Sequence, residues 1–140
     1  MSNRHRFMQA VEQATLAPSS HNTQPWIFEL GYHEIRLFAD RTRGLPVNDP
    51  DDRELTISCG CALFNLRVAA AADGVGLAVR GFPDPADEDL LAEVRPDGFP
   101  DGALAGLAPL VPARRTYRKR FAPREVAADA VEALKAAAVA

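Results

Sequence analysis

Apolar residues recur at helical spacing near the start of the chain. Between residues 5 and 16, Phe7, Met8 and Val11, followed by Thr15 or Leu16, lie three or four positions apart. This spacing predicts an amphipathic helix over residues 5–16. Pro18 ends the predicted helix, because the residue before a proline is pushed out of helical geometry.

A second apolar stripe predicts the central helix of the domain. It continues to Asp73, Gly74 is a natural stop, and Asp51 or Asp52 is positioned to cap its beginning. The stripe consists of Leu55, Cys59, Ala62, Leu63, Leu66, Ala69 and Ala70.

Four short segments have the composition of strands. Residues 26–30 and 34–39 flank the glycine-containing turn 31–33, which predicts a β-hairpin. Residues 77–82 and 90–95 predict two further strands. The polar segment 40–52 contains Gly44, Pro46 and Pro50 and predicts a loop.

The C-terminal third begins with a segment rich in proline and glycine. Residues 96–112 predict a linker with one short helical turn. Pro123 suits the first turn of a last helix, whose apolar stripe is Val126, Ala130, Leu134 and Ala137. No stop signal follows this stripe, so we expect the chain to be a fragment of a longer protein.

Composition narrows the class of protein. A chain of 140 residues has the size of one domain, and 47% hydrophobic with 25% charged residues is ordinary globular composition. A net charge of −3 gives no general attraction to nucleic acid or anionic membranes. No uninterrupted apolar run approaches a membrane span, and no signal core follows the N-terminus. We therefore expect a soluble, cytoplasmic protein.

The two cysteines, Cys59 and Cys61, are one residue apart on the predicted central helix. A disulfide between them would be strained, because their side chains diverge on a helix. The three histidines add no cluster with metal-ligand spacing. We therefore expect small core residues here and no metal site.

Residues 17–26, Ala-Pro-Ser-Ser-His-Asn-Thr-Gln-Pro-Trp, concentrate polar chemistry between two prolines. Pro18 and Pro25 restrict the backbone, and the residues between them offer neutral hydrogen-bond donors and acceptors. Such a loop suits a polar heteroaromatic ligand. The alternative is a well-capped turn from helix to strand with Trp26 in the core.

The same ten residues closely resemble the signature Ala-Pro-Ser-x-x-Asn-x-Gln-Pro-Trp of the nitroreductase superfamily. The form Ser-His-Asn-Thr-Gln-Pro-Trp-x-Phe is similar to its Acg branch. The match continues through Asp40-Arg41-Thr-Arg43, through 49–55 and through 57–66, where the family usually shows Cys-Gly-Ala. The resemblance covers most of residues 5–121.

The resemblance implies an α+β, nitroreductase-like fold with helices packed on a small, mainly antiparallel sheet. Members of the superfamily bind FMN where two copies of the fold meet, either in a dimer or in two fused repeats. By resemblance, residues 1–95 are a first repeat, 96–112 a linker and 113–140 the truncated start of a second. Pro18, Ser19, Ser20 and Asn22 would face the flavin.

A basic cluster, Arg114-Arg115-Thr116-Tyr117-Arg118-Lys119-Arg120, precedes the last predicted helix. It resembles the Arg-x-Ser-x-Arg-like motif with which nitroreductases hold the FMN phosphate, and arginine suits a phosphate through charge-assisted bonds. The resemblance assigns the phosphate to Arg114 and Arg118 and a hydroxyl contact to Thr116. The alternative is a solvated basic stretch or a nucleic-acid patch. The cluster has no pattern of interleaved aromatic residues and the chain has no net positive charge, so we expect no nucleic-acid partner.

By resemblance, the function is that of an FMN-dependent oxidoreductase, which passes hydride from NADPH or NADH through the flavin to a nitroaromatic or quinone. No arrangement of Cys, His or carboxylate residues suggests a separate catalytic group, and His21 is interpreted as structural. The alternatives are a flavin-sequestering protein with little turnover and an inactive fragment. A homodimer, or a second repeat beyond residue 140, would complete the site.

Overall fold

The fold is built on one four-stranded sheet. The computed structural model describes residues 3–139, and its strands are β1 (Trp26–Leu30), β2 (Ile35–Ala39), β3 (Leu77–Gly81) and β4 (Leu90–Pro96). Their spatial order is β1-β2-β4-β3, and every neighbouring pair is antiparallel. The predicted hairpin is confirmed, with Trp26 opposite Ala39 and Leu30 opposite Ile35.

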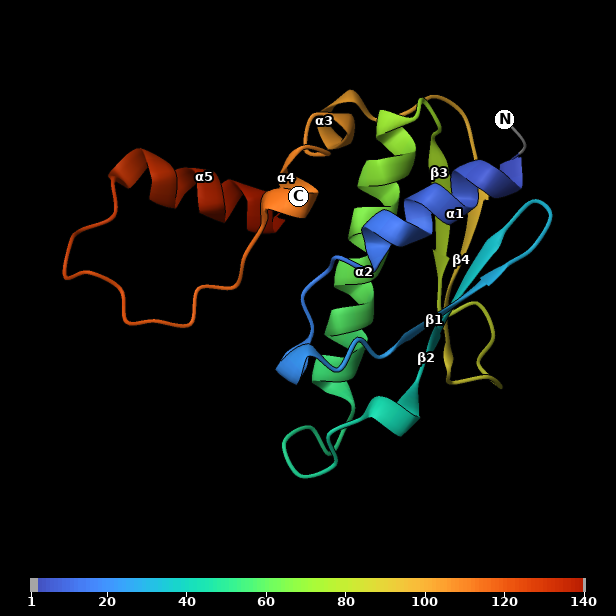
Figure 1. The fold of residues 1–140 in the computed structure, drawn as a ribbon, viewed down its shortest axis with the longest axis horizontal. Coiled ribbons are helices and arrows are strands. Elements are labelled where there is room, and N and C mark those ends of the chain that lie inside the picture. The colour runs from blue at the N-terminus through green and yellow to red at the C-terminus, as the bar shows by residue number, and fades with distance from the viewer. Residues whose placement is uncertain (1–2, 140) are drawn as a thin grey trace.

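Two helices pack on one face of this sheet (Figure 1). The first, α1 (Asn3–Ala14), crosses the longer α2 (Arg53–Ala72), and α2 also contacts the sheet. The α+β class, with helices on an antiparallel sheet, is therefore confirmed. By length and composition α2 could cross a membrane, but its apolar residues form the core of this domain.

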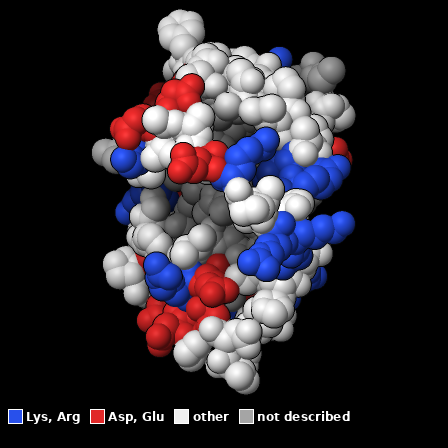
Figure 2. Space-filling view, turned by 90° about the vertical axis from the view of Figure 1, so that its left-hand side faces the viewer, with Lys and Arg blue, Asp and Glu red and all other residues white. Residues whose placement is uncertain are grey.

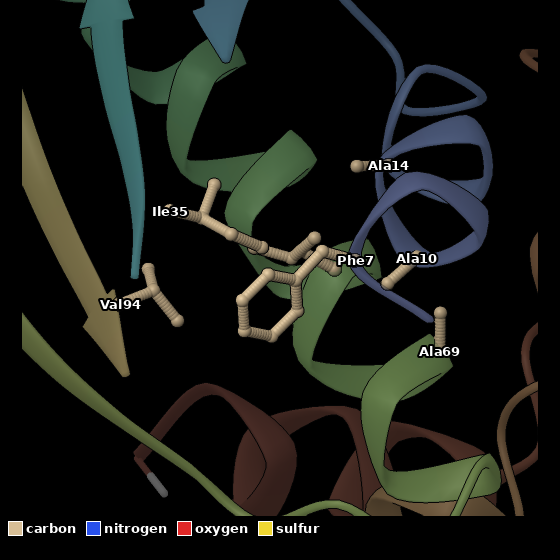
Figure 3. Packing of buried hydrophobic residues seen from close by; sticks show 7 residues of the cluster. Phe7, Ala10, Ala14, Ile35, Ala69 and Val94 are labelled. Carbon is tan, nitrogen blue, oxygen red and sulfur yellow. The ribbon is translucent and has the colours of Figure 1, made fainter. Parts of the chain in front are cut away.

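The first core cluster joins α1, α2, β2 and β4 (Figure 3). Phe7 reaches from α1 toward Ile35 of β2 and Val94 of β4, while Leu66 of α2 is fully buried. The alanines of the cluster, Ala10 and Ala14 of α1 and Ala69 of α2, are the small residues between the helices.

The predicted inward face of α1 was partly wrong. Met8 is 47% exposed and Leu16 is 41% exposed, whereas Ala10 and Ala14 are buried. Small side chains allow two helices to approach closely, so the larger residues lie outside the contact. The helix also ends at Ala14 instead of residue 16, with tighter turn hydrogen bonds leading to Ala17.

A second core cluster lies along the other half of the sheet. Leu55 and Cys59 of α2 pack against β2 and β4 residues, including Leu37 and Leu91. Trp26 is half-buried against the same cluster. This placement agrees with Trp26 as an anchor of β1.

Two predictions about the C-terminal third were wrong in detail. Residues 96–112 contain two short helices instead of one helical turn, α3 (Gly102–Ala105) and α4 (Leu110–Ala113), and α3 packs on α2. Pro123 does not begin the last helix, because α5 runs from Ala128 to Val139. Residues 114–130 are exposed, so no packing contact sets where the last helix begins. Intrinsic helix propensity then favours the alanine-rich stretch and not the preceding Pro-Arg-Glu-Val segment.

The predicted stripe of α5 is solvent-exposed in this chain. Leu134 is 69% exposed, and Val126, before the helix, is exposed as well. The segment that leads to α5 stands away from the sheet and its two long helices (Figure 1).

Candidate functional site

The loop between α1 and β1 lies beside the N-terminal half of α2 (Figure 1). It includes a short 3-10 turn, η1 (Ser20–Asn22), which contacts α2. The cleft of about 290 Å³ lined by Phe7, Ala70 and Gly76 lies at the C-terminal end of α2 instead, and no residue of this loop lines it.

Ser19 and Ser20 hold the loop from both sides. The Ser19 hydroxyl accepts a hydrogen bond from the Gln24 backbone N–H at 2.9 Å. The Ser20 N–H donates to Ser58 Oγ at 3.3 Å, and the Ser20 hydroxyl donates to Glu54 Oε2 at 2.5 Å. The loop is therefore fixed both internally and to α2.

Three residues of this loop have left-handed backbone conformations. His21, Asn22 and Gln24 have φ values of 51°, 58° and 51°. Each costs about 1–2 kcal/mol for a residue with a side chain, so the surrounding contacts must impose this shape. Such strain is common at ligand-binding segments.

Two residues of the loop contact the segment that follows β2. His21 Nε2 lies 3.4 Å from Asn48 Nδ2, and Arg43 Nη1 donates to the Thr23 carbonyl at 3.3 Å. His21 therefore has a polar neighbour, in agreement with its structural interpretation. Asn22 is exposed and Pro18 half-buried.

The end of the loop is fixed by the carbonyl of the buried Pro25. It accepts the Asp40 N–H at 3.0 Å and the Cys59 thiol at 3.1 Å. Burial raises the pKa of Cys59 to about 12, so this thiol stays protonated as a donor. Cys59 is a core residue, as predicted, whereas Cys61, also expected in the core, is only half-buried.

Asp52 occupies the N-cap position of α2, one of the two positions predicted, but the carboxylate that bonds to this helix end is that of Asp49. The Asp49 carboxylate accepts the Leu55 N–H at 2.9 Å, while Asp52 has a left-handed backbone and no side-chain cap bond. Burial opposes ionisation of Asp49, but hydrogen bonds from the first N–H groups of α2 outweigh it and lower its pKa. Asp52 instead binds Arg41.

Arg41 joins three segments near this end of α2. Its guanidinium pairs with Asp89 and Asp52, both at 2.5 Å, and these bonds, led by the one to Asp89, raise the pKa of Arg41. The neighbouring Asp40 carboxylate accepts from the Thr42 hydroxyl and N–H, and the hydroxyl bond is the main cause of its lowered pKa.

The first residue of the basic cluster contacts the chain just after the end of α1. Arg114 Nη2 donates to the Leu16 carbonyl at 3.3 Å, and Arg114 Nη1 donates to Thr116 Oγ1 at 3.1 Å. Arg118 is exposed and makes no hydrogen bond or ion pair within residues 3–139. The neighbouring Arg115 folds back onto the Pro112 and Arg114 carbonyls.

The five cationic side chains of this cluster form no salt bridge with the described part of the chain. The side of the molecule from which this segment projects carries a concentration of Lys and Arg (Figure 2). Arginines without a carboxylate partner attract anions, and phosphate suits their guanidinium groups best.

The structure therefore brings together some of the predicted site residues and leaves one apart. Arg114, which also bonds to Thr116, meets the chain two residues before Pro18, and Ser19 and Ser20 lie in the loop that follows. No hydrogen bond links Arg118 to this loop within the described residues.

Sequence reasoning missed Glu54, Ser58 and Asp49, the residues that support the loop and the adjacent helix end. Glu54 and Ser58 are four positions apart, which places them on one face of a helix. That spacing was visible in the sequence, but only the fold shows that this face meets the loop. Asp49 is outside the cap position expected from the apolar pattern.

Solved structures of other proteins have a similar fold. No protein-family model matches the chain. A nitroreductase family protein of known structure from Streptococcus pneumoniae has a TM-score of 0.58 at 17% identity, covering 94% of this chain and 89% of that protein. A "Putative NADH Oxidase" from Clostridium acetobutylicum has a TM-score of 0.55 at 16% identity, over 71% of this chain and 78% of that one.

Sequence similarity is higher to two proteins of Mycobacterium tuberculosis. "Putative NAD(P)H nitroreductase Rv3131" is 42% identical over 109 residues, which are 77% of this chain and 32% of that protein. "Putative NAD(P)H nitroreductase acg" is 39% identical over 115 residues, or 81% of this chain and 35% of that protein.

The fold and these relatives identify the chain as a member of the nitroreductase superfamily. Within it, the similarity is to the Acg branch, as the signature in residues 17–26 predicted. The chain spans about a third of the length of the curated relatives it matches.

Proposed function

We propose that this chain forms part of a flavin site in an FMN-dependent oxidoreductase. The enzyme takes hydride from NADPH or NADH and passes it to an electron-poor acceptor such as a nitroaromatic or a quinone. Membership of the nitroreductase superfamily supports the reaction class. The chemistry of the loop and of the basic cluster supports FMN as the cofactor.

The observation that carries the proposal is the bond from Arg114 to the Leu16 carbonyl. Residues 98 positions apart in the sequence meet there, so Arg114, the first cation of the basic cluster, lies at the start of the polar loop. FMN needs both kinds of contact, since its ring is a polar heteroaromatic and its phosphate is an anion.

The donors on these residues fit this assignment. Arginine carries five N–H donors, and Arg114 uses two of its terminal nitrogens within the chain, which leaves N–H groups for a phosphate. The Thr116 hydroxyl accepts from Arg114, so its own proton is free to be donated. Pro18, Ser19, Ser20 and Asn22 are the proposed ring contacts.

Bound FMN would supply the redox chemistry, and the chain supplies binding and orientation. Arg114 and Arg118 would hold the phosphate, Thr116 would donate a hydroxyl proton to it, and the strained loop would present fixed polar groups to the ring. The chain itself contributes no separate nucleophile to this proposal.

The proposal includes a second copy of the fold, from another subunit or from a following repeat, to complete the site. In that arrangement residues 1–95 form the first repeat, 96–112 the linker and 113–140 the start of the second. The exposed apolar residues Phe121 and Leu134 support this part, since such residues are usually covered. We place the enzyme in the cytoplasm.

The test is a visible absorption spectrum of the purified protein after addition of FMN and removal of the excess. Retained flavin is the expected result. Arg114→Ala and Arg118→Ala should each weaken FMN binding about 10- to 100-fold, the loss expected for one charge-assisted hydrogen bond. Arg95→Ala, which removes an exposed arginine that pairs with Glu34 on the sheet, is the matched control.

Two results would contradict the proposal. Affinity that is the same in Arg114→Ala, Arg118→Ala and the control would remove the phosphate assignment. Flavin that is retained but not reduced by NADPH or NADH under anaerobic conditions would indicate a sequestering protein instead of an enzyme.

A further inference from the structure

The loop that faces the proposed cofactor has a backbone that its own sequence does not favour. Three non-glycine residues between positions 21 and 24 are left-handed, and residues with a Cβ enter that region only at a cost. Prolines at 18 and 25 limit the ends of the loop but do not determine φ between them. Contacts from outside the loop must therefore select this shape.

Asn48 and Arg43, which follow β2, supply two of these contacts, and one face of α2 supplies the two that hold Ser20. Ser58 accepts the Ser20 N–H at 3.3 Å, and Glu54 accepts the Ser20 hydroxyl at 2.5 Å. Ser58 is only 4% exposed, and its hydroxyl donates its proton to the Glu54 carbonyl at 2.7 Å. Its oxygen can therefore only accept from the loop, which fixes the direction of the Ser20 N–H bond.

The same contacts restrict what Ser20 can offer to a ligand. A serine hydroxyl has one proton and two acceptor lone pairs. The Ser20 proton is held by the Glu54 carboxylate, a strong acceptor. Toward a ligand Ser20 can therefore act only as an acceptor, and its partner must be an N–H or O–H group.

We infer that Glu54 and Ser58 are positioning residues for the cofactor loop, and that Glu54 makes Ser20 an acceptor for an N–H edge of the flavin ring. This inference rests on the proposed function for the identity of the ligand. The anchoring itself rests only on the contacts between α2 and the loop. Neither Glu54 nor Ser58 contacts the basic cluster in the described structure.

Riboflavin separates the ring contacts from the phosphate contacts, because it has the same ring and no phosphate. Glu54→Ala and Ser58→Ala should weaken riboflavin and FMN by the same factor, about tenfold. Arg114→Ala should weaken FMN alone. Glu54→Gln, which keeps an oxygen that can accept the Ser20 proton, should recover most of the affinity lost in Glu54→Ala.

Amide hydrogen exchange tests the anchoring without any ligand. The backbone N–H groups of Ser20 and Gln24 should exchange about tenfold faster in Ser58→Ala and Glu54→Ala than in the wild type. Asp129→Ala is the matched control, because it removes an acid from the first turn of a different helix, α5.

The outcomes separate the two ideas. Exchange in the loop that is unchanged from the control would overturn the positioning role, whatever the flavin result. Faster exchange together with unchanged riboflavin affinity would overturn the assignment of Ser20 to the ring. If the wild type binds neither FMN nor riboflavin, the proposed function fails and the ring contact with it, while faster exchange would still support the anchoring.

Discussion

Leu66→Ala tests whether α2 holds the domain together through the first core cluster. Leu66 is fully buried among residues of α1, β2, β4 and α2. The substitution removes three methylene-sized groups from an apolar site, which costs about 2.4 kcal/mol at about 0.8 kcal/mol each. Leu66 does not line the open cleft beside this cluster, so neighbours and water do not readily fill the space.

The remaining cavity adds about 1 kcal/mol, because packed neighbours relax only partly. The expected loss is therefore about 3.5 kcal/mol, a large fraction of the roughly 5–15 kcal/mol that holds a domain folded. In a protein of this size the melting temperature should fall by about 10–14 °C.

Urea unfolding followed by circular dichroism measures the effect, and the slope m should stay constant while the midpoint falls. Ile57→Ala on the same helix is the control, because its side chain is 52% exposed and its loss should cost less than about 1 kcal/mol. If the two variants differ by less than about 1 kcal/mol, the helix face described here does not form the core.

Three further outcomes follow from the end of α2 and its surroundings. Asp49→Ala should lower the melting temperature by about 4 °C, as loss of a helix cap does. Because the pKa of Asp49 is lowered by folding, its contribution to stability is full above about pH 4 and is lost as the pH falls through its folded-state pKa. The melting temperatures of the variant and the wild type should therefore converge at lower pH. A difference that widens there would contradict the assignment. Ellman's reagent at pH 8 should titrate Cys61 alone in the folded chain and both thiols in denaturant, because burial raises the pKa of Cys59 to about 12. Rapid reaction of two thiols without denaturant would show that Cys59 is accessible. Arg41→Ala should cost no more than about 1 kcal/mol, since the Arg41 side chain is 42% exposed and its ion pairs are screened, and urea midpoints should show a smaller cost in 1 M salt than in low salt.

Most secondary-structure elements could be predicted from the sequence because their signals are local. The alternation and turn residues of the hairpin and the long apolar stripe of α2 depend on neighbours a few positions away. The loop between Pro18 and Pro25 was also recognisable, since two prolines enclose a run of polar side chains. The nitroreductase-like fold followed from resemblance and not from these patterns.

The wrong predictions share a physical cause. The helical pattern was assigned from the large apolar residues, which placed Met8 on the inner face of α1. Close contact between α1 and α2 instead buries the small residues Ala10 and Ala14. Pro123 is a good first residue for a helix, yet nothing packs on that exposed segment to favour a helix there.

The sequence by itself determined where the two long helices and the four strands lie and which loop carries the polar groups. The tertiary structure decided the strand order β1-β2-β4-β3, the Arg114 contact with the Leu16 carbonyl and the anchoring of Ser20 by Glu54 and Ser58. The reason is that a local pattern depends on residues within one or two turns, whereas the β2–β4 pairing, the Arg114 contact and the two contacts of Ser20 each join residues more than 30 positions apart. Which distant pairs meet is set by how the helices and the sheet pack as a whole.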